Sequence, residues 1–206
     1  MTEKPMIGSN VKAIVEMEWK LFDQVQNIGG RADCQDNRTT FFIMRSSQLM
    51  VWSTEMLDSY YDDLLTAHRS GRNLLTEKYA YMMERTSPEE FAGIRDALPP
   101  RSPQKDADIE EICKAHVIWQ EELAAQYPRL TGNGRPIRRS ADSKVCTSFE
   151  TYLWGELATY SEKTIQLYAA YVRRLQREGK NLCRMILENT VSQYGYASLE
   201  QAESRQ

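Results

Sequence analysis

The chain has 206 residues, of which 41% are hydrophobic and 27% are charged, and its net charge is −3. These values argue against disorder and predict a sizeable core. The slight acidity excludes the basic surface of a typical nucleic-acid binder, and no apolar run is long enough to span a bilayer. Because the start also lacks a signal-peptide layout, we expect a cytoplasmic protein with no membrane or nucleic-acid partner.

Apolar residues recur at helical spacing through the first half, with capping residues between the segments. A polar loop over residues 29–38 separates the first two helices, and Ser87 with Pro88 marks a further helix start. The predicted helices begin at Ser9, at Thr39 or Thr40, at Ser53 and at Asn73, and they end near Asn27 (with Gly29 after it), Trp52, Gly71 and Arg85.

The Pro-rich segment 98–105 predicts a stiff linker. After it, the order of predicted helices and loops in the first half is repeated. A long polar loop over residues 128–145 follows the first helix of this half. No segment shows the two-residue period of a strand, so the chain is predicted to be all-α. Helices are expected from Asp106 or Asp108 to about Tyr127, from Thr147 or Ser148, from Ser161 to Gly179, from Asn181 to about Gln193, and from Ser198.

Residues 39–74 are echoed by residues 147–182 at a constant separation of 108. A fixed period of self-similarity indicates one supersecondary unit used twice. We therefore predict a single domain over residues 1–206, a helical bundle of two pseudo-symmetric repeats of about four helices each, near 9–97 and 106–206. The alternative is chance similarity between amphipathic helices. The matches include Phe41 with Phe149, Leu49 with Leu157, Ser53 with Ser161, and Tyr60 with Tyr168.

Two tight corners are part of this repeat. Gly71 and Gly179 suit the left-handed conformation that ends a helix, and Asn73 and Asn181 suit the cap of the next helix. We interpret these residues as structural. Trp19 and Trp119 fall in corresponding first helices, although there the separation is 100.

Comparison of the two copies suggests where a site lies. Glu150 replaces Phe42, Leu153 replaces Arg45, and Glu156 and Gln48 are polar in otherwise apolar helical faces. A buried charge is costly unless it is paired. We expect Arg45, Gln48, Glu150 and Glu156 to form a polar pocket between the repeats, with both glutamates as acid/base or cation-binding groups and Arg45 as their partner. The alternative is that Arg45 and Glu150 lie at the partly wet edge of the apolar stripe.

The two inter-helix loops are a second candidate. They carry arginines beside helix starts, which suits a carboxylate or phosphate. Arg31 and Arg139 are the predicted anion clamps, and Gln48, Arg138 and Tyr152 are further predicted ligand-binding residues; solvated surface arginines are the alternative. The loops also contain Cys34, Arg129, Arg135 and Lys144.

A metal site is not predicted. A di-iron bundle needs Glu-x-x-His on two helices, but Cys113 stands three residues before His116 and Leu65 before His68. The four cysteines are far apart, without a Cys-x-x-Cys pair, and are expected to be reduced.

Four segments have distinctive sequences: residues 27–36 (NIGGRADCQD), 40–45 (TFFIMR), 73–79 (NLLTEKY) and 147–153 (TSFETYL). Together they resemble a bacterial domain-of-unknown-function family, number 4125, over nearly the whole chain. The resemblance implies no assigned activity. It does imply that relatives accompany a nucleotidyltransferase-like domain.

Two functions are therefore open. The first is binding of a polar or anionic small molecule between the repeats, with catalysis as an extension; a cavity lined by the charges would favour it. The second is a non-enzymatic helical module that docks a catalytic partner such as a nucleotidyltransferase-like protein; a tightly packed seam would favour that. The sequence predicts no particular cofactor.

Overall fold

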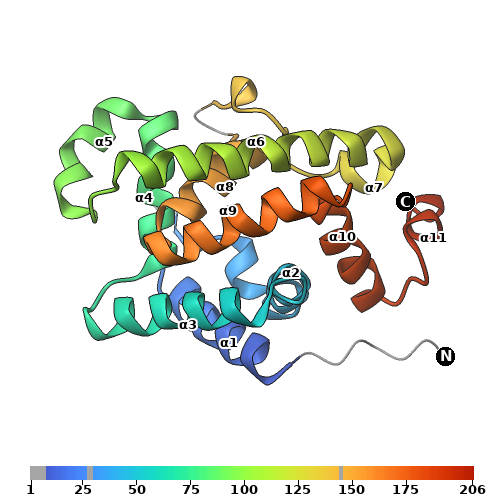
Figure 1. The fold of residues 1–206 in the computed structure, drawn as a ribbon, viewed down its shortest axis with the longest axis horizontal. Helices are drawn as coiled ribbons and strands as arrows, with labels where there is room; N and C mark the ends of the chain where they lie inside the picture. The colour runs from blue at the N-terminus through green and yellow to red at the C-terminus, as the bar shows by residue number, and fades with distance from the viewer. Residues whose placement is uncertain (1–7, 27–29, 144–145) are drawn as a thin grey trace.

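The computed structural model describes residues 8–26, 30–143 and 146–206, and every regular element in these ranges is a helix (Figure 1). The all-α prediction is thus confirmed for the described residues; Asn27, Gly29 and Lys144 lie outside them. The α-helices are α1 (Ser9–Asp23), α2 (Arg38–Leu49), α3 (Thr54–Arg69), α4 (Leu74–Thr86), α5 (Pro88–Ile94), α6 (Pro103–Gln126), α7 (Pro128–Gly132), α8 (Phe149–Ala158), α9 (Glu162–Arg177), α10 (Leu182–Gln193) and α11 (Leu199–Ser204). Short 3-10 turns are η1 (Asp33–Asp36), η2 (Arg95–Ala97) and η3 (Arg139–Ala141).

Local capping chemistry explains several helix starts. The Ser53 hydroxyl accepts a hydrogen bond from the Met56 amide at 3.3 Å, and Ser161 caps α9 in the same way. Asn73 and Asn181 cap α4 and α10 through their side-chain oxygens. These four predicted caps are confirmed.

Other predicted starts are wrong by a few residues. Asn37 caps α2 and accepts from the Thr40 amide, so α2 begins before Thr39. Ser102 caps α6, with Pro103 at its first position, so the predicted linker loses its last three residues to a helix. Ser9 lies within α1, and the Ser87 side chain makes no capping hydrogen bond.

The helices of the two halves interleave. α1 packs against α2, α3 and α4, while α6 packs against α8, α9 and α10. Across the halves, α3 packs against α9, α4 lies along α8, and α10 lies along α2. Figure 1 shows α6 and α9 side by side, with α3 and α1 on the opposite side of the molecule. We call the α4–α8 and α2–α10 contacts the seam.

A glycine permits the close approach of α4 to α8. A Cβ built at Gly155 would stand 2.5 Å from Met82 Cγ and 2.9 Å from the Lys78 carbonyl oxygen. Any larger side chain would therefore push the two helices apart.

Some helix bounds and two glycine corners recur at a separation of 108 residues. Shifting α3 by 108 residues gives the bounds of α9, and the same shift carries the first residue of α4 onto that of α10. Gly71 and Gly179 have φ of +68° and +64°, which confirms the predicted left-handed corners.

The first helices of the halves have a different register from the predicted one. The Asn73 side chain donates to the Leu21 carbonyl, and the Asn181 side chain donates to the Trp119 carbonyl. By these contacts Trp119 matches Leu21, a separation of 98 rather than 100. Trp19 and Trp119 therefore lie at different levels of their helices.

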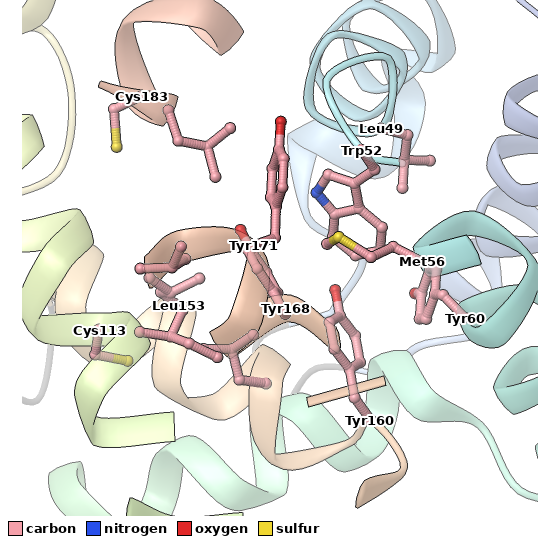
Figure 2. Close-up of a cluster of buried hydrophobic side chains, with 14 of the residues drawn as sticks. Leu49, Trp52, Met56, Tyr60, Cys113, Leu153, Tyr160, Tyr168, Tyr171 and Cys183 are labelled. Atoms are coloured by element: carbon pink, nitrogen blue, oxygen red, sulfur yellow. The ribbon is translucent and has the colours of Figure 1, made fainter. Parts of the chain in front are cut away.

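The core contains an aromatic group contributed by α3, α9 and the segments that follow α2 and α8 (Figure 2). The Trp52 indole contacts three phenol rings, those of Tyr60, Tyr160 and Tyr168, with centroids 5.2–6.1 Å away. All four side chains are buried. Among the described helices, none is long and apolar enough to cross a membrane.

Candidate functional site

Charged side chains from four helices meet beside this aromatic group. Glu18 comes from α1, Arg45 and Gln48 from α2, Lys78 from α4, and Glu156 from α8. We call these five residues the charged cluster. The side chains of its four charged members are 14% exposed or less.

Arg45 links the two carboxylates. Its Nε donates to Glu18 at 2.8 Å, and Nη1 donates to Glu156 at 2.8 Å. Nη1 also donates to the Gln48 side-chain oxygen at 2.7 Å. Burial acts to lower the pKa of Arg45, but the two carboxylates outweigh it and hold the pKa well above its ordinary value.

Glu156 is the most heavily bonded carboxylate of the cluster. Besides Arg45, it accepts from Lys78 Nζ at 2.7 Å, from the Tyr160 hydroxyl at 2.8 Å and from Gln48 at 3.4 Å. Burial acts to raise the pKa of Glu156, but Arg45 and Lys78 hold it well below the ordinary value. Glu156 is therefore a carboxylate at neutral pH whose oxygens are already occupied.

The cluster is neutral and internally satisfied. Its two carboxylates face two cations, and the Tyr60 hydroxyl donates to Glu18 at 2.6 Å. Burial, followed by the nearby carboxylates, raises the pKa values of Tyr60 and Tyr160, so both phenols remain donors. Such a network is stable when every member is paired and costly when one is lost.

Three of the four residues predicted to line a polar pocket lie together, as a packed group of hydrogen-bonded side chains. Arg45, Gln48 and Glu156 come together, but the predicted pairing of Arg45 with Glu150 is wrong. Glu150 accepts from the Arg139 amide at 2.9 Å and lies 3.8 Å from the Arg139 guanidinium. Six residues separate Glu150 from Glu156, so they project from different sides of α8.

The loop arginines that were predicted to bind a ligand already have carboxylate partners. Arg31 pairs with Asp23 at 2.6 Å and with Asp36 at 2.7 Å. Arg138 pairs with Glu121 at 2.6 Å, and the weaker Arg139 pair is the one with Glu150. The charges of Arg31 and Arg138 are therefore each balanced by a carboxylate, whereas the pair made by Arg139 is long.

A second group of residues lies where Lys78 approaches the surface. Lys78 Nζ stands 3.5 Å from the centre of the Tyr152 ring, and the Arg135 guanidinium stands 4.7 Å from it. Tyr79 interacts electrostatically with Tyr152, and both residues are partly buried. We call Lys78, Tyr79, Arg135 and Tyr152 the tyrosine face.

Arg135 differs from the other loop arginines. It is exposed, and its Nη1 donates to the Thr147 carbonyl at 3.1 Å. Among the ion pairs of the described residues, none includes Arg135. Its positive charge is therefore exposed to solvent beside the Tyr152 ring.

The two phenols of this face differ electrostatically. Lys78 lowers the pKa of Tyr152, against the effect of burial. Burial raises the pKa of Tyr79, and Tyr152 and Cys34 act in the same direction. Tyr152 is consequently the more acidic member of the pair.

Sequence analysis missed Glu18, Lys78, Tyr79 and Arg135 as site residues. A signal was present for two of them. Glu18 stands between Val15 and Phe22 on the buried face of α1, and Lys78 stands among buried residues of α4. Both are charges within an apolar helical stripe, the same pattern that identified Glu156.

Two surface hollows lie away from the charged cluster. One, of about 530 Å³, is next to the Gly179 corner and is lined partly by Glu122, Lys180 and Arg184. The other, of about 410 Å³, is lined partly by Tyr81 and Arg101. Within the described ranges, no three His, Cys, Asp or Glu side chains are grouped to hold a metal ion.

The profile of the family described as "Protein of unknown function (DUF4125)" matches residues 9–204, so the chain belongs to that family. No curated protein and no solved structure matches the chain.

Proposed function

We propose that this protein binds a small anionic molecule at the tyrosine face. The observation that carries the proposal is the Tyr152 ring with Lys78 and Arg135 both against it; among the described residues, a carboxylate pairs with Lys78 and none pairs with Arg135. An exposed guanidinium that pairs with no acid among the described residues, next to two partly buried tyrosines, suits a carboxylate or an oxyanion.

In this proposal the charged cluster supports the site and does not react. Glu156 holds Lys78 at 2.7 Å, so the ammonium is fixed beneath Tyr152. Arg45, Gln48 and Tyr160 in turn fix Glu156. Glu156 and Arg45 are thus positioning residues, Tyr152 is a ligand contact, and Arg135 takes the clamp role that Arg31 and Arg139 were expected to have.

Calorimetric titration with sulfate and with oxalate tests this. Arg135→Gln removes one charge-assisted contact, worth about 1.5–3 kcal/mol, so binding should weaken by about tenfold or more. Arg177→Gln is the control, because Arg177 is an exposed arginine at the end of α9. Absence of binding of both anions to the wild-type protein, or equal loss in the two variants, would refute the anion site.

A second candidate is the helical module that docks a nucleotidyltransferase-like partner. The internal satisfaction of the charged cluster favours it, because the seam offers no unpaired charge for catalysis. Co-purification of such a partner with the full chain, retained in Arg135→Gln, would support docking without the anion site.

We also propose that residues 9–97 and 106–206 are copies within one domain. The matching bounds of α3 and α9, the two glycine corners and the reciprocal α4–α8 and α2–α10 packing support this. Superposition of residues 39–85 on 147–193 tests it, and a different helix order or direction would refute it. The four free cysteines support the expectation of a reducing bacterial cytoplasm.

A further inference from the structure

Beyond the anion site at the tyrosine face, we propose that the hollow beside the Gly179 corner binds a zwitterion of the α-amino-acid class with an apolar side chain. Lys180 and Arg184 receive the carboxylate of this ligand, Glu122 receives its ammonium, and its side chain lies on the apolar wall of the hollow.

The hollow has the size and the wall that such a ligand needs. It lies between α6 and the corner that joins α9 to α10, and its volume is about 530 Å³. Small-molecule sites typically have volumes of about 300–1,000 Å³, so there is room for one amino acid. Its apolar wall is formed by Leu123, which is buried, and by Met185, which packs partly buried against the core. A ligand with an apolar part gains from covering this wall.

Glu122 supplies a carboxylate that no cation neutralises. Among the described residues it makes no ion pair, although Lys180 and Arg184 line the same hollow. Its Oε2 accepts from the Asn181 side chain at 2.9 Å, and the Asn181 side-chain oxygen accepts from the Arg184 amide at 2.9 Å. Asn181 therefore links the acidic side of the hollow to the basic side without bringing the two charges into contact. The acidic side suits an ammonium group.

The basic side has two cations, whose present partners are exposed. Lys180 Nζ pairs with Glu178 at 2.7 Å, and Arg184 Nε pairs with Glu188 at 3.0 Å. Exposed pairs of this kind contribute little to stability, so a ligand carboxylate can replace either glutamate as the partner. The Arg184 guanidinium also donates to the Gln126 side chain at 3.0 Å, which holds it at the hollow.

The equivalent positions of the first corner are closed by an internal ion pair. There, the Arg72 guanidinium donates to both carboxylate oxygens of Glu77, at 2.7 and 2.6 Å. At a separation of 108 residues, Lys180 stands in place of Arg72, and Met185 stands in place of Glu77. This ion pair cannot form at the second corner, where Lys180 and Met185 line the hollow instead. The lining therefore follows from the residues of the second corner and not from the turn itself.

A ligand with both charges complements this lining better than a simple ion does. An anion alone would have the same sign as Glu122, and a cation alone would have the same sign as Lys180 and Arg184. An α-amino acid presents its ammonium and its carboxylate on one carbon atom, with the side chain on the same atom. It therefore offers each sign to the side of the hollow that attracts it, and repulsion disfavours the single ions.

Titration followed by proton–nitrogen correlation NMR of the full chain tests this, with L-leucine as the probe. L-Leucinamide keeps the ammonium but lacks the carboxylate, and isocaproate keeps the carboxylate but lacks the ammonium. We expect L-leucine to shift the backbone amide signals of Lys180, Arg184 and Met185 in a saturable way. Each analogue should bind about fivefold more weakly or worse, the ratio expected for one charge contact at an exposed site.

Variants separate the two sides of the hollow. Glu122→Gln should weaken L-leucine by about fivefold or more but should not weaken isocaproate, because it removes only the contact with the ammonium. Arg184→Gln should weaken both ligands, and Lys180→Gln gives the same reading if Arg184→Gln does not fold. Glu55→Gln and Arg69→Gln are the matched controls, because both residues are exposed and lie outside the hollow.

Three outcomes would overturn the proposal. The first is the absence of saturable shifts at the hollow with L-leucine, and the second is equal dissociation constants for L-leucine and its two analogues. The third is an equal effect of Glu122→Gln and Glu55→Gln on L-leucine binding. The anion site at the tyrosine face is tested with other probes and another variant, so it stands or falls independently of these results.

Discussion

Replacing Arg45 by leucine, the residue at its counterpart position 153, should be strongly destabilising. In the structure it would leave Glu18 and Glu156 facing only one cation, Lys78, within a largely dry seam. Breaking a buried pair typically costs about 3–5 kcal/mol, against about 0–1 kcal/mol for an exposed pair. Glu156→Gln should cost a similar amount, because it leaves Arg45 and Lys78 with only one carboxylate.

The double variant is the decisive measurement. Arg45→Leu with Glu156→Gln removes both partners of the 2.8 Å Arg45–Glu156 contact, so its loss is counted once rather than twice. We expect it to cost several kcal/mol less than the sum of the single variants, which is about 6–10 kcal/mol if each costs about 3–5.

Urea unfolding with equal m-values is the assay. If the single Arg45→Leu variant is unfolded in buffer, Arg45→Gln, which removes the charge but keeps a polar side chain, takes its place in the cycle. A coupling free energy within about 0.5 kcal/mol of zero would refute the argument that the cluster is stabilised by mutual neutralisation.

Three further predictions concern single positions. Gly71→Ala and Gly179→Ala should each lower the free energy of unfolding by about 1 kcal/mol, because a Cβ is disfavoured at positive φ; no loss in chemical denaturation would contradict this. Gly155→Ala should cost about 1–3 kcal/mol in the same assay despite the better helix propensity of alanine, since its Cβ meets the α4 backbone, and a gain in stability would show that α4 moves away easily. Burial lowers the pKa of His116 to about 4, so its neutral form is favoured in the folded state. The stability that it contributes should be complete above about pH 6.5 and lost as pH falls towards 4, at most about 3 kcal/mol. His116→Gln should remove this part of the pH dependence of stability, whereas His68→Gln should not, because His68 is exposed. The same dependence of unfolding free energy on pH in both variants would refute the role of His116.

Local features of this protein were predictable from the sequence because the interactions behind them span only a few residues. Ser53 bonds the amide three residues later, and Gly71 needs only its own φ angle. The same locality explains the failures at helix starts. Ser102 with Pro103 is a cap and first-turn signal as good as any other, but the prolines around it were interpreted as a linker.

The candidate site was predictable only in part, because its contacts are between residues far apart in the chain. A charge within an apolar stripe indicates that Arg45 and Glu156 each point inward. They are 111 positions apart in the chain, however, and hydrophobic periodicity does not predict contacts between such distant residues. This separation also explains why the wrong partner was predicted for Arg45. Glu150 and Glu156 both lie on α8, and only the packing of α8 against the other helices determines which of the two contacts Arg45.

Sequence alone thus determined the helical class and the glycine corners, because turn chemistry and hydrophobic period act within one or two turns of chain. Tertiary structure decided which charges neutralise each other: Arg31 and Arg138 pair with carboxylates, whereas Arg135 donates to a backbone carbonyl. Those outcomes depend on the distances between helices and loops that only the complete packing sets, and a shift of a few ångströms there exchanges one ion pair for another.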